Sequence, residues 1–284
     1  LGLVIYFYAS RELTKSIEKS LLMALLASLY FVTLRISWDL LENMLGSVLL
    51  FVTLTLLQKN GKSWKWYVVL SLGMISVVLA HPLVAAIMLV IVAVTILHGV
   101  LQHKRNEARR LIVTSVPAMW IFLLIVYANY PSFSVMSSFP RRELGGWFSL
   151  FGFASYSDMA SNTLGFLLYC FLPLLPFVVM GVRRLRNLQV NSWFLCGLIA
   201  ALSPLISPDS FIPGGYRWTL MLVFPMAFYA AEALAHFKSN VCRLLVASFL
   251  AALTIGFVVM PCETAFPYYT LFPNYVPSSM LQNT

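Results

Sequence analysis

Apolar residues fill long stretches of this chain, and short polar loops separate them. Several stretches reach or approach the roughly 20 residues with which a helix crosses a bilayer. They are apolar all round, whereas strands of a membrane β-barrel alternate apolar and polar residues over about ten positions. The pattern predicts an all-α fold, a polytopic transmembrane helix bundle of about ten spans. The segments are 1–10, 20–37, 41–57, 64–80, 83–100, 111–128, 163–181, 192–206, 217–235 and 244–260.

The composition supports this fold class. Of the 284 residues, 60% are apolar and 10% are charged, whereas soluble domains are about half apolar and about a quarter charged. The four cysteines occur singly and without a CxxC pair, so they predict buried small side chains rather than a disulfide framework or a zinc site. They are Cys170, Cys196, Cys242 and Cys262.

Basic residues gather in every second loop. Five loops, with the flanking Lys65, hold 15 of the 19 lysines and arginines: 11–19, 58–63, 101–110, 182–191 and 236–243. The positive-inside rule places these loops in the cytoplasm and both ends of the chain on the outer side of a plasma or cell membrane. The net charge of +9 then orients the chain in the membrane and contacts anionic membrane lipids. A nucleic-acid partner is not needed to explain it. Near the last basic loop, Glu232 and His236 are one turn apart and are predicted to pair.

The outer side is predicted to hold one long loop and a tail. Loop 129–162 is longer than a simple connection needs. We divide the chain into a transmembrane helical domain, 1–260, and an extracytoplasmic tail, 261–284, that leads toward a further domain. Because the chain begins without Met and inside an apolar segment, we expect a fragment that opens within a membrane span.

Three charges interrupt the apolar pattern within LRISWDLLENMLG, residues 34–46. Basic loops flank residues 20–57, so two spans must fit there, and Arg35, Asp39 and Glu42 fall at the outer membrane boundary. On a helix these three positions share one face. We predict an ion pair between Arg35 and Asp39, with Glu42 as the freer carboxylate that contacts substrate or a metal ion. The alternative is a charged hairpin turn with no binding role.

A second outer turn is very short. Residues 64–100 also contain two spans, which leaves little more than His81 and Pro82 between them. Pro82 suits the first turn of the following helix. His81 is either a polar turn residue or a group that binds phosphate or transfers a proton.

Two further outer loops carry arginine. In SPDSFIPGGYRW, residues 207–218, Asp209 lies in a loop rich in Pro and Gly, and Tyr216 and Arg217 open the ninth span. Arg217 either anchors this helix at the lipid headgroups or clamps a phosphate bidentately. Arg141 and Arg142 in the long loop allow the same two interpretations. We expect the outer ends of spans two, three, four, five and nine to converge on one cleft that contains Arg35, His81 and Arg217.

Four features together resemble a known family. They are the hairpin R-x-S-W-D-L-x-x-N-x-L-G, the HP turn, the long outer loop and GGYRW at the start of a late span. This combination is similar to polytopic glycosyltransferases of the GT-C superfamily, which take sugars from polyprenyl-phosphate-linked donors. Large members have about thirteen spans with catalytic acids in the first outer loop, so this chain would correspond to a member without its first three spans.

The resemblance implies sugar transfer on the outer face of the membrane. A carboxylate upstream of Leu1 would activate the acceptor hydroxyl, so the fragment alone would be inactive. Arg217, with Arg35 or His81, would hold the lipid phosphate as it leaves. A divalent metal ion is the cofactor to consider, with Glu42 and Glu143 as candidate ligands. The chain lacks the WWDYG motif of oligosaccharyltransferases, and the residues around Glu143 differ from their loop motif, which favours a single-sugar transferase.

Two other functions use the same residues. In a transporter or flippase of a lipid-linked or anionic substrate, the arginines would contact the substrate and the long loop would act as a gate. Against this, no ionisable residue is evident in the middle of a span and no internal repeat is visible, and many transporters have both. The third function is that of a non-catalytic membrane subunit.

Overall fold

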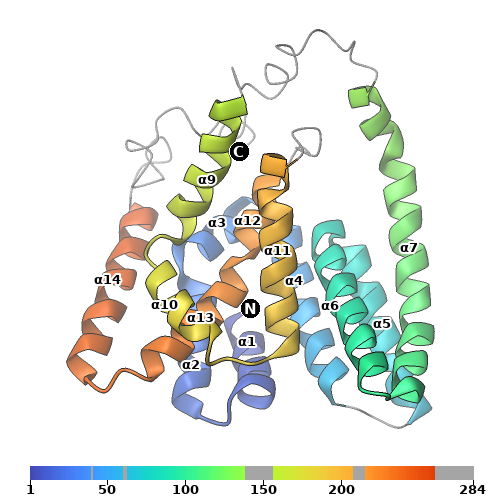
Figure 1. Ribbon diagram of the computed structural model, residues 1–284, viewed down its shortest axis with the longest axis horizontal. Helices are drawn as coiled ribbons and strands as arrows, with labels where there is room; N and C mark the ends of the chain where they lie inside the picture. Colours follow the sequence, from blue (N-terminus) through green and yellow to red (C-terminus); the bar gives the residue numbers. More distant parts are fainter. Residues whose placement is uncertain (40, 60–62, 138–155, 207–214, 260–284) are drawn as a thin grey trace.

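The structure is a bundle of α-helices (Figure 1). The computed structural model describes residues 1–39, 41–59, 63–137, 156–206 and 215–259. No strand occurs within these ranges, so the predicted all-α class is confirmed. The helices are α1 (Gly2–Tyr8), the π-helical turn η1 (Ala9–Leu13), α2 (Ile17–Leu29), α3 (Phe31–Asp39), α4 (Leu41–Gln58), α5 (Trp64–Ala80), α6 (Pro82–Leu101), α7 (Arg105–Ser137), α9 (Tyr156–Phe171), α10 (Leu175–Val182), α11 (Leu188–Ile206), α12 (Gly215–Met221), α13 (Val223–Ala235) and α14 (Asn240–Val259).

Each apolar segment predicted from the sequence coincides with one helix or with two successive helices. By length and composition, four stretches can cross a membrane alone: Pro82–Leu101, Arg105–Ala128, Leu188–Leu205 and Arg217–Ala235. A fifth crossing arises if α9 and α10 form one bent span. The apolar stretches Glu42–Gln58, Trp64–Ala80 and Val241–Gly256 are shorter. The structure therefore supports a bundle with several membrane spans, and the count of ten stays a prediction.

The outward surface of the bundle is apolar as well. On α7, the side chains of Val113, Trp120 and Leu124 are 65%, 60% and 59% exposed. Soluble monomers rarely expose large contiguous apolar surfaces. Lipid chains are the surroundings that such a helix face matches.

Three of the predicted spans are each divided into two helices. The backbone becomes extended at Tyr30, between α2 and α3. Helices α9 and α10 meet at 82°, and Pro173 and Pro176 at this bend have no N–H for a helical hydrogen bond. A third break falls at Leu222 between α12 and α13, just before Pro225. Two of these breaks follow from proline, whereas the one at Tyr30 has no such signal in the sequence.

The first two breaks contact each other. The Tyr30 hydroxyl donates a hydrogen bond of 2.9 Å to the carbonyl of Cys170 at the end of α9. The Thr33 hydroxyl donates at 2.8 Å to the carbonyl of Ala27, which the interruption of α2 leaves without its helical partner. Backbone groups inside a membrane must be satisfied by protein, so these side chains compensate for the breaks.

Helix α13 forms the centre of the bundle. All its residues from Val223 to Leu234 are buried, and it packs against α10, α2 and α11. Phe224 and Phe228 on α13 lie with their ring centroids 5.4 Å and 5.9 Å from that of Phe51 on α4. This aromatic contact joins the last third of the chain to the first.

The helix ends sort into two groups (Figure 1). The starts of α2, α5, α7, α11 and α14, which follow the five basic loops, lie at the lower end of the view. We call this the basic end. The end of α3 and the starts of α4, α6 and α12 lie toward the opposite end, which we call the His81 end. Successive predicted spans therefore alternate in direction, as expected for a chain that repeatedly crosses a membrane.

The predicted outer loop 129–162 was too wide. Helix α7 continues through residues 129–137, and α9 begins at Tyr156. Residues 138–155 and the predicted tail, 261–284, lie outside the described residues.

Gly181 offers a test of the packing between α10 and α13. A Cβ atom at Gly181 would lie 1.9 Å from the carbonyl oxygen of Tyr229, so we expect Gly181→Ala to destabilise the protein by about 1–3 kcal/mol through overpacking. At Gly256 on α14 a Cβ atom would meet nothing within 4 Å, and Gly256→Ala is the matched control. Thermal unfolding in detergent micelles measures both. Equal melting temperatures for the two variants would contradict the close α10–α13 contact.

Candidate functional site

His81 forms the whole connection between α5 and α6. Helix α5 ends at Ala80 and α6 starts at Pro82, as the sequence predicted for this turn. The backbone of His81 is extended, with φ −163° and ψ 127°, and its side chain caps α6. The Nδ1 atom accepts a hydrogen bond of 3.2 Å from the N–H of Leu83. Pro82, which has no N–H, occupies the first helical position, where none is needed.

This cap determines what His81 can offer to a ligand. In a neutral imidazole one nitrogen accepts and the other carries the proton. Because Nδ1 accepts from Leu83, the proton of the neutral ring is on Nε2. Burial lowers the pKa of His81, the positive charge of Arg217 lowers it further, and the carboxylate of Glu42 opposes both. His81 is therefore neutral at pH 7 and has one N–H donor left.

Arg217 lies close enough to His81 for its charge to act on the imidazole. It belongs to α12 and is partly buried. Helix α12 packs against α11 and α3, and α11 packs in turn against α6, the helix that His81 caps. Two residues that the sequence analysis assigned to one site are thus brought together by contacts between helices far apart in the chain.

Glu42 reaches the same place from α4. Its side chain is exposed in the first turn of this helix, and its charge acts on His81. One turn later, α4 approaches the start of α6 closely. A Cβ atom at Gly46 would lie 3.1 Å from Cγ2 of Val84 and 3.3 Å from Cβ of His81. The glycine therefore allows the first turns of α4 and α6 to pack directly on each other.

The other predicted site residues are described only in part. Arg35 and Asp39 lie one turn apart on α3, which contacts both α4 and α12, so their backbone reaches the His81 end. Their side chains, and that of Tyr216 on α12, lie outside the described residues. The Arg35–Asp39 pair therefore stays a prediction. Asp209, Arg141, Arg142 and Glu143 also fall outside the described residues.

Asn43 is a polar residue of this region that the sequence analysis did not select. It follows Glu42 in α4, and its side chain is fully buried. Within the part of the chain that the structure describes, neither its Nδ2 nor its Oδ1 has a hydrogen-bond partner. A buried polar group without a partner costs about 1–3 kcal/mol. The signal in the sequence was an asparagine beside three charged residues in an otherwise apolar stretch, but only the structure shows that the amide is buried.

The described residues hold no group of three or more His, Cys, Asp or Glu side chains that could bind a metal ion. Of the two predicted metal ligands, Glu42 lies near enough to His81 for its charge to act on the imidazole, and Glu143 lies outside the described ranges. The described part of the site brings one guanidinium, one imidazole N–H and one carboxylate into the same region.

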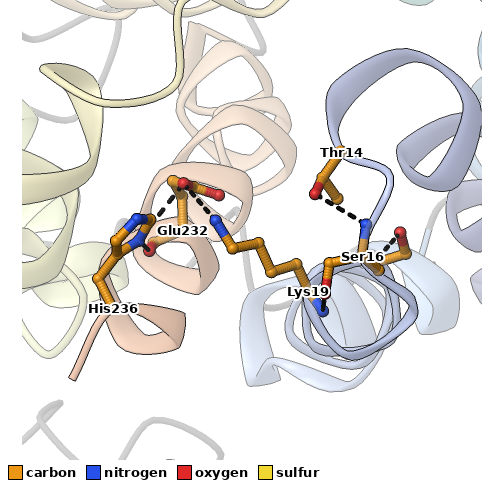
Figure 2. Close-up of polar contacts among 6 residues, drawn as sticks. Thr14, Ser16, Lys19, Glu232 and His236 are labelled. Carbon is orange, nitrogen blue, oxygen red and sulfur yellow. Dashed lines mark hydrogen bonds and ion pairs between the residues drawn. The ribbon is translucent and has the colours of Figure 1, made fainter. Parts of the chain in front are cut away.

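The charges at the basic end have a different role. Nζ of Lys19 on α2 lies 2.9 Å from Oε1 of Glu232 on α13, and Nδ1 of His236 lies 3.4 Å from the same oxygen (Figure 2). The predicted pairing of Glu232 with His236 is confirmed. These side chains neutralise one another and hold the start of α2 against the end of α13, so they support the bundle rather than leave a charge for a ligand.

His81→Asn tests the protonation state of the site. Asparagine retains an acceptor for the cap of α6 but does not titrate. Because the folded-state pKa of His81 is below the unfolded value of about 6.5, the unfolded chain binds the proton more tightly. Its contribution to stability is therefore complete above about pH 6.5 and is lost as the pH falls through the folded-state pKa. We expect the melting temperature of His81→Asn in detergent to fall less than that of wild type on acidification. Parallel acid profiles would contradict this assignment.

Comparisons with family models, curated proteins and solved structures found no match to this chain. The resemblance to GT-C glycosyltransferases therefore stays a prediction from the sequence. The function is accordingly argued from the side chains at the His81 end.

Proposed function

We propose that this protein is an integral membrane glycosyltransferase of the GT-C type, which moves a sugar from a polyprenyl-phosphate-linked donor to an acceptor on the outer face of the membrane. One observation carries the proposal: Arg217 lies near the neutral, capped His81 at the end of the bundle opposite the basic loops. A lipid-linked phosphate would enter this region from the membrane with its charge at the helix ends.

The chemistry requires an anion site next to the sugar. An acceptor hydroxyl, which loses its proton to a carboxylate, attacks C1 of the sugar. The bond between C1 and the phosphate oxygen breaks, and its electron pair leaves on the polyprenyl phosphate. Arg217 would hold this phosphate bidentately, and the Nε2–H of His81 would donate a further hydrogen bond, so that the negative charge that develops is stabilised. Glu42 is the exposed carboxylate for contact with the sugar.

The proposal includes the topology of the chain. Ten crossings, with the five basic loops in the cytoplasm, place the His81 end and residues 129–162 on the outer side. The alternation of helix directions and the basic residues at one end support this arrangement. It positions Arg217 and His81 where a donor that is already outside the cytoplasm can reach them.

Donor binding by Arg217 variants tests the function. The protein in nanodiscs is titrated with a labelled polyprenyl-phosphate hexose, with the unphosphorylated polyprenol as ligand control. We expect Arg217→Ala to weaken binding about 10- to 100-fold, since a hydrogen bond to a charged group contributes about 1.5–3 kcal/mol. Arg217→Lys should recover part of the affinity, because lysine lacks the bidentate fork. Arg184→Ala, an exposed arginine at the basic end, should bind as wild type does.

Sugar transfer and transport give different products in this system. In proteoliposomes with the complete gene product, a transferase separates the labelled hexose from the lipid phosphate, whereas a flippase moves the intact donor across the bilayer. If Arg217→Ala binds the donor with wild-type affinity, Arg217 only anchors its helix at the lipid headgroups, and the proposal is overturned. Movement of intact donor without loss of its sugar would replace the transferase by the transporter.

Cysteine labelling tests the topology. In a chain whose own four cysteines are replaced by serine, Ser63→Cys and Ser157→Cys each introduce one thiol at an exposed position. We expect a membrane-impermeant maleimide to label Ser157→Cys in intact cells and Ser63→Cys only after permeabilisation, because the basic loop at 58–63 faces the cytoplasm in the ten-span arrangement. Labelling of both positions from the same side would show that the number of crossings between them is even.

A further inference from the structure

Asn43 is a buried amide whose surroundings the fold leaves unexplained, and buried indole N–H groups of Trp66 and Trp193 share that state among the described residues. The Asn43 amide is fully buried in the first turn of α4, and among the described residues neither Nδ2 nor Oδ1 has a hydrogen-bond partner. Nearby polar side chains behave differently. The hydroxyl of Ser47, one turn later, donates a hydrogen bond of 2.7 Å to the backbone carbonyl of Asn43. Farther along the same helix, the hydroxyl of Thr53 donates a hydrogen bond of 2.8 Å to the backbone carbonyl of Leu49. An apolar residue would fill the same volume at Asn43 without the cost of an unpaired amide.

The position of Asn43 connects it to the His81 end. Asn43, Gly46 and Ser47 are buried on one face of α4, because residues three and four apart lie on the same side of a helix. Gly46 on this face is packed against His81 and Val84. Asn43 lies one turn closer to the start of α4, next to Glu42, whose charge acts on His81.

We propose that Asn43 is a ligand-binding residue of this site, in which its Nδ2 group donates a hydrogen bond to the phosphate of the polyprenyl-phosphate ligand. The proposal rests on the proposed function only in requiring a lipid phosphate, and it holds whether that lipid is a transferase donor or a transported substrate. An amide supplies two donors and no charge. Together with the guanidinium of Arg217 and the single N–H of His81, it gives the phosphate oxygens donors from α4, α6 and α12.

The same amide has an acceptor that phosphate cannot use. The Oδ1 atom needs a donor, and the hydroxyl groups of a sugar on the phosphate are donors. Asn43 therefore contributes more to the binding of a polyprenyl-phosphate hexose than to that of the bare polyprenyl phosphate. This difference distinguishes Asn43 from Arg217, which contacts the phosphate alone.

The experiment compares stability and binding in the same variants. Asn43→Leu is nearly isosteric and removes the unpaired amide, so we expect a higher melting temperature in the empty protein and about tenfold weaker binding of polyprenyl-phosphate hexose in nanodiscs, with a smaller loss for the bare phosphate. Asn43→Asp keeps the size but brings a carboxylate to the phosphate, and its binding should be weaker still. Ser47→Ala, a buried polar deletion one turn away, is the control and should bind as wild type does.

The outcomes separate this proposal from the proposed function. A stabilised Asn43→Leu that binds both lipids with wild-type affinity overturns the role of Asn43, while the Arg217 series still supports the site. A destabilised Asn43→Leu also overturns it, because the amide would then have a partner within the protein. Absence of phosphate-lipid binding by the wild type overturns both proposals together.

Discussion

The complete burial of α13 is the constraint on which the rest of the bundle depends. Its residues from Val223 to Leu234 are buried on all sides, so α2, α10 and α11 must surround it. The absence of a side chain at Gly181 lets α10 approach the backbone of Tyr229, and Phe51 of α4 packs against two of its aromatic rings. Helix α12 precedes α13 directly, so this packing also determines where Arg217 is held.

The two ends of the bundle differ in which charged and titratable side chains they bring together. At the basic end, Lys19 and His236 each lie within ion-pair distance of Glu232, so the protein itself supplies a counter-charge there. At the His81 end, a cation and a buried imidazole lie near each other, and the imidazole is held neutral by this proximity and by burial. The carboxylate of Glu42 opposes both effects. Our proposal places ligand binding at the His81 end because an arginine and an imidazole N–H lie near each other there.

The sequence predicted those features of the candidate site that depend on residues close together in the chain. A turn of one residue followed by Pro82 placed His81 directly before a helix, and the spacing of Glu232 and His236 placed them on one helix face. The burial of Asn43 could not be predicted from the sequence, because asparagine is also common at exposed helix starts and because the residues around it come from other helices. The break at Tyr30 was missed for a similar reason, since its compensation comes from the contact with Cys170.

The sequence by itself determined the class of the protein and the position of nearly every helix, because the length of an apolar run and the placement of proline act within one segment. It also separated a basic end from an end with few charges, since alternating loops follow directly from counting crossings. The tertiary structure alone decided that Arg217 and Glu42 lie close enough to His81 for their charges to act on it. Their proximity depends on how α4, α6, α11 and α12 pack, and side-chain packing between distant segments leaves no periodic signal in either of them.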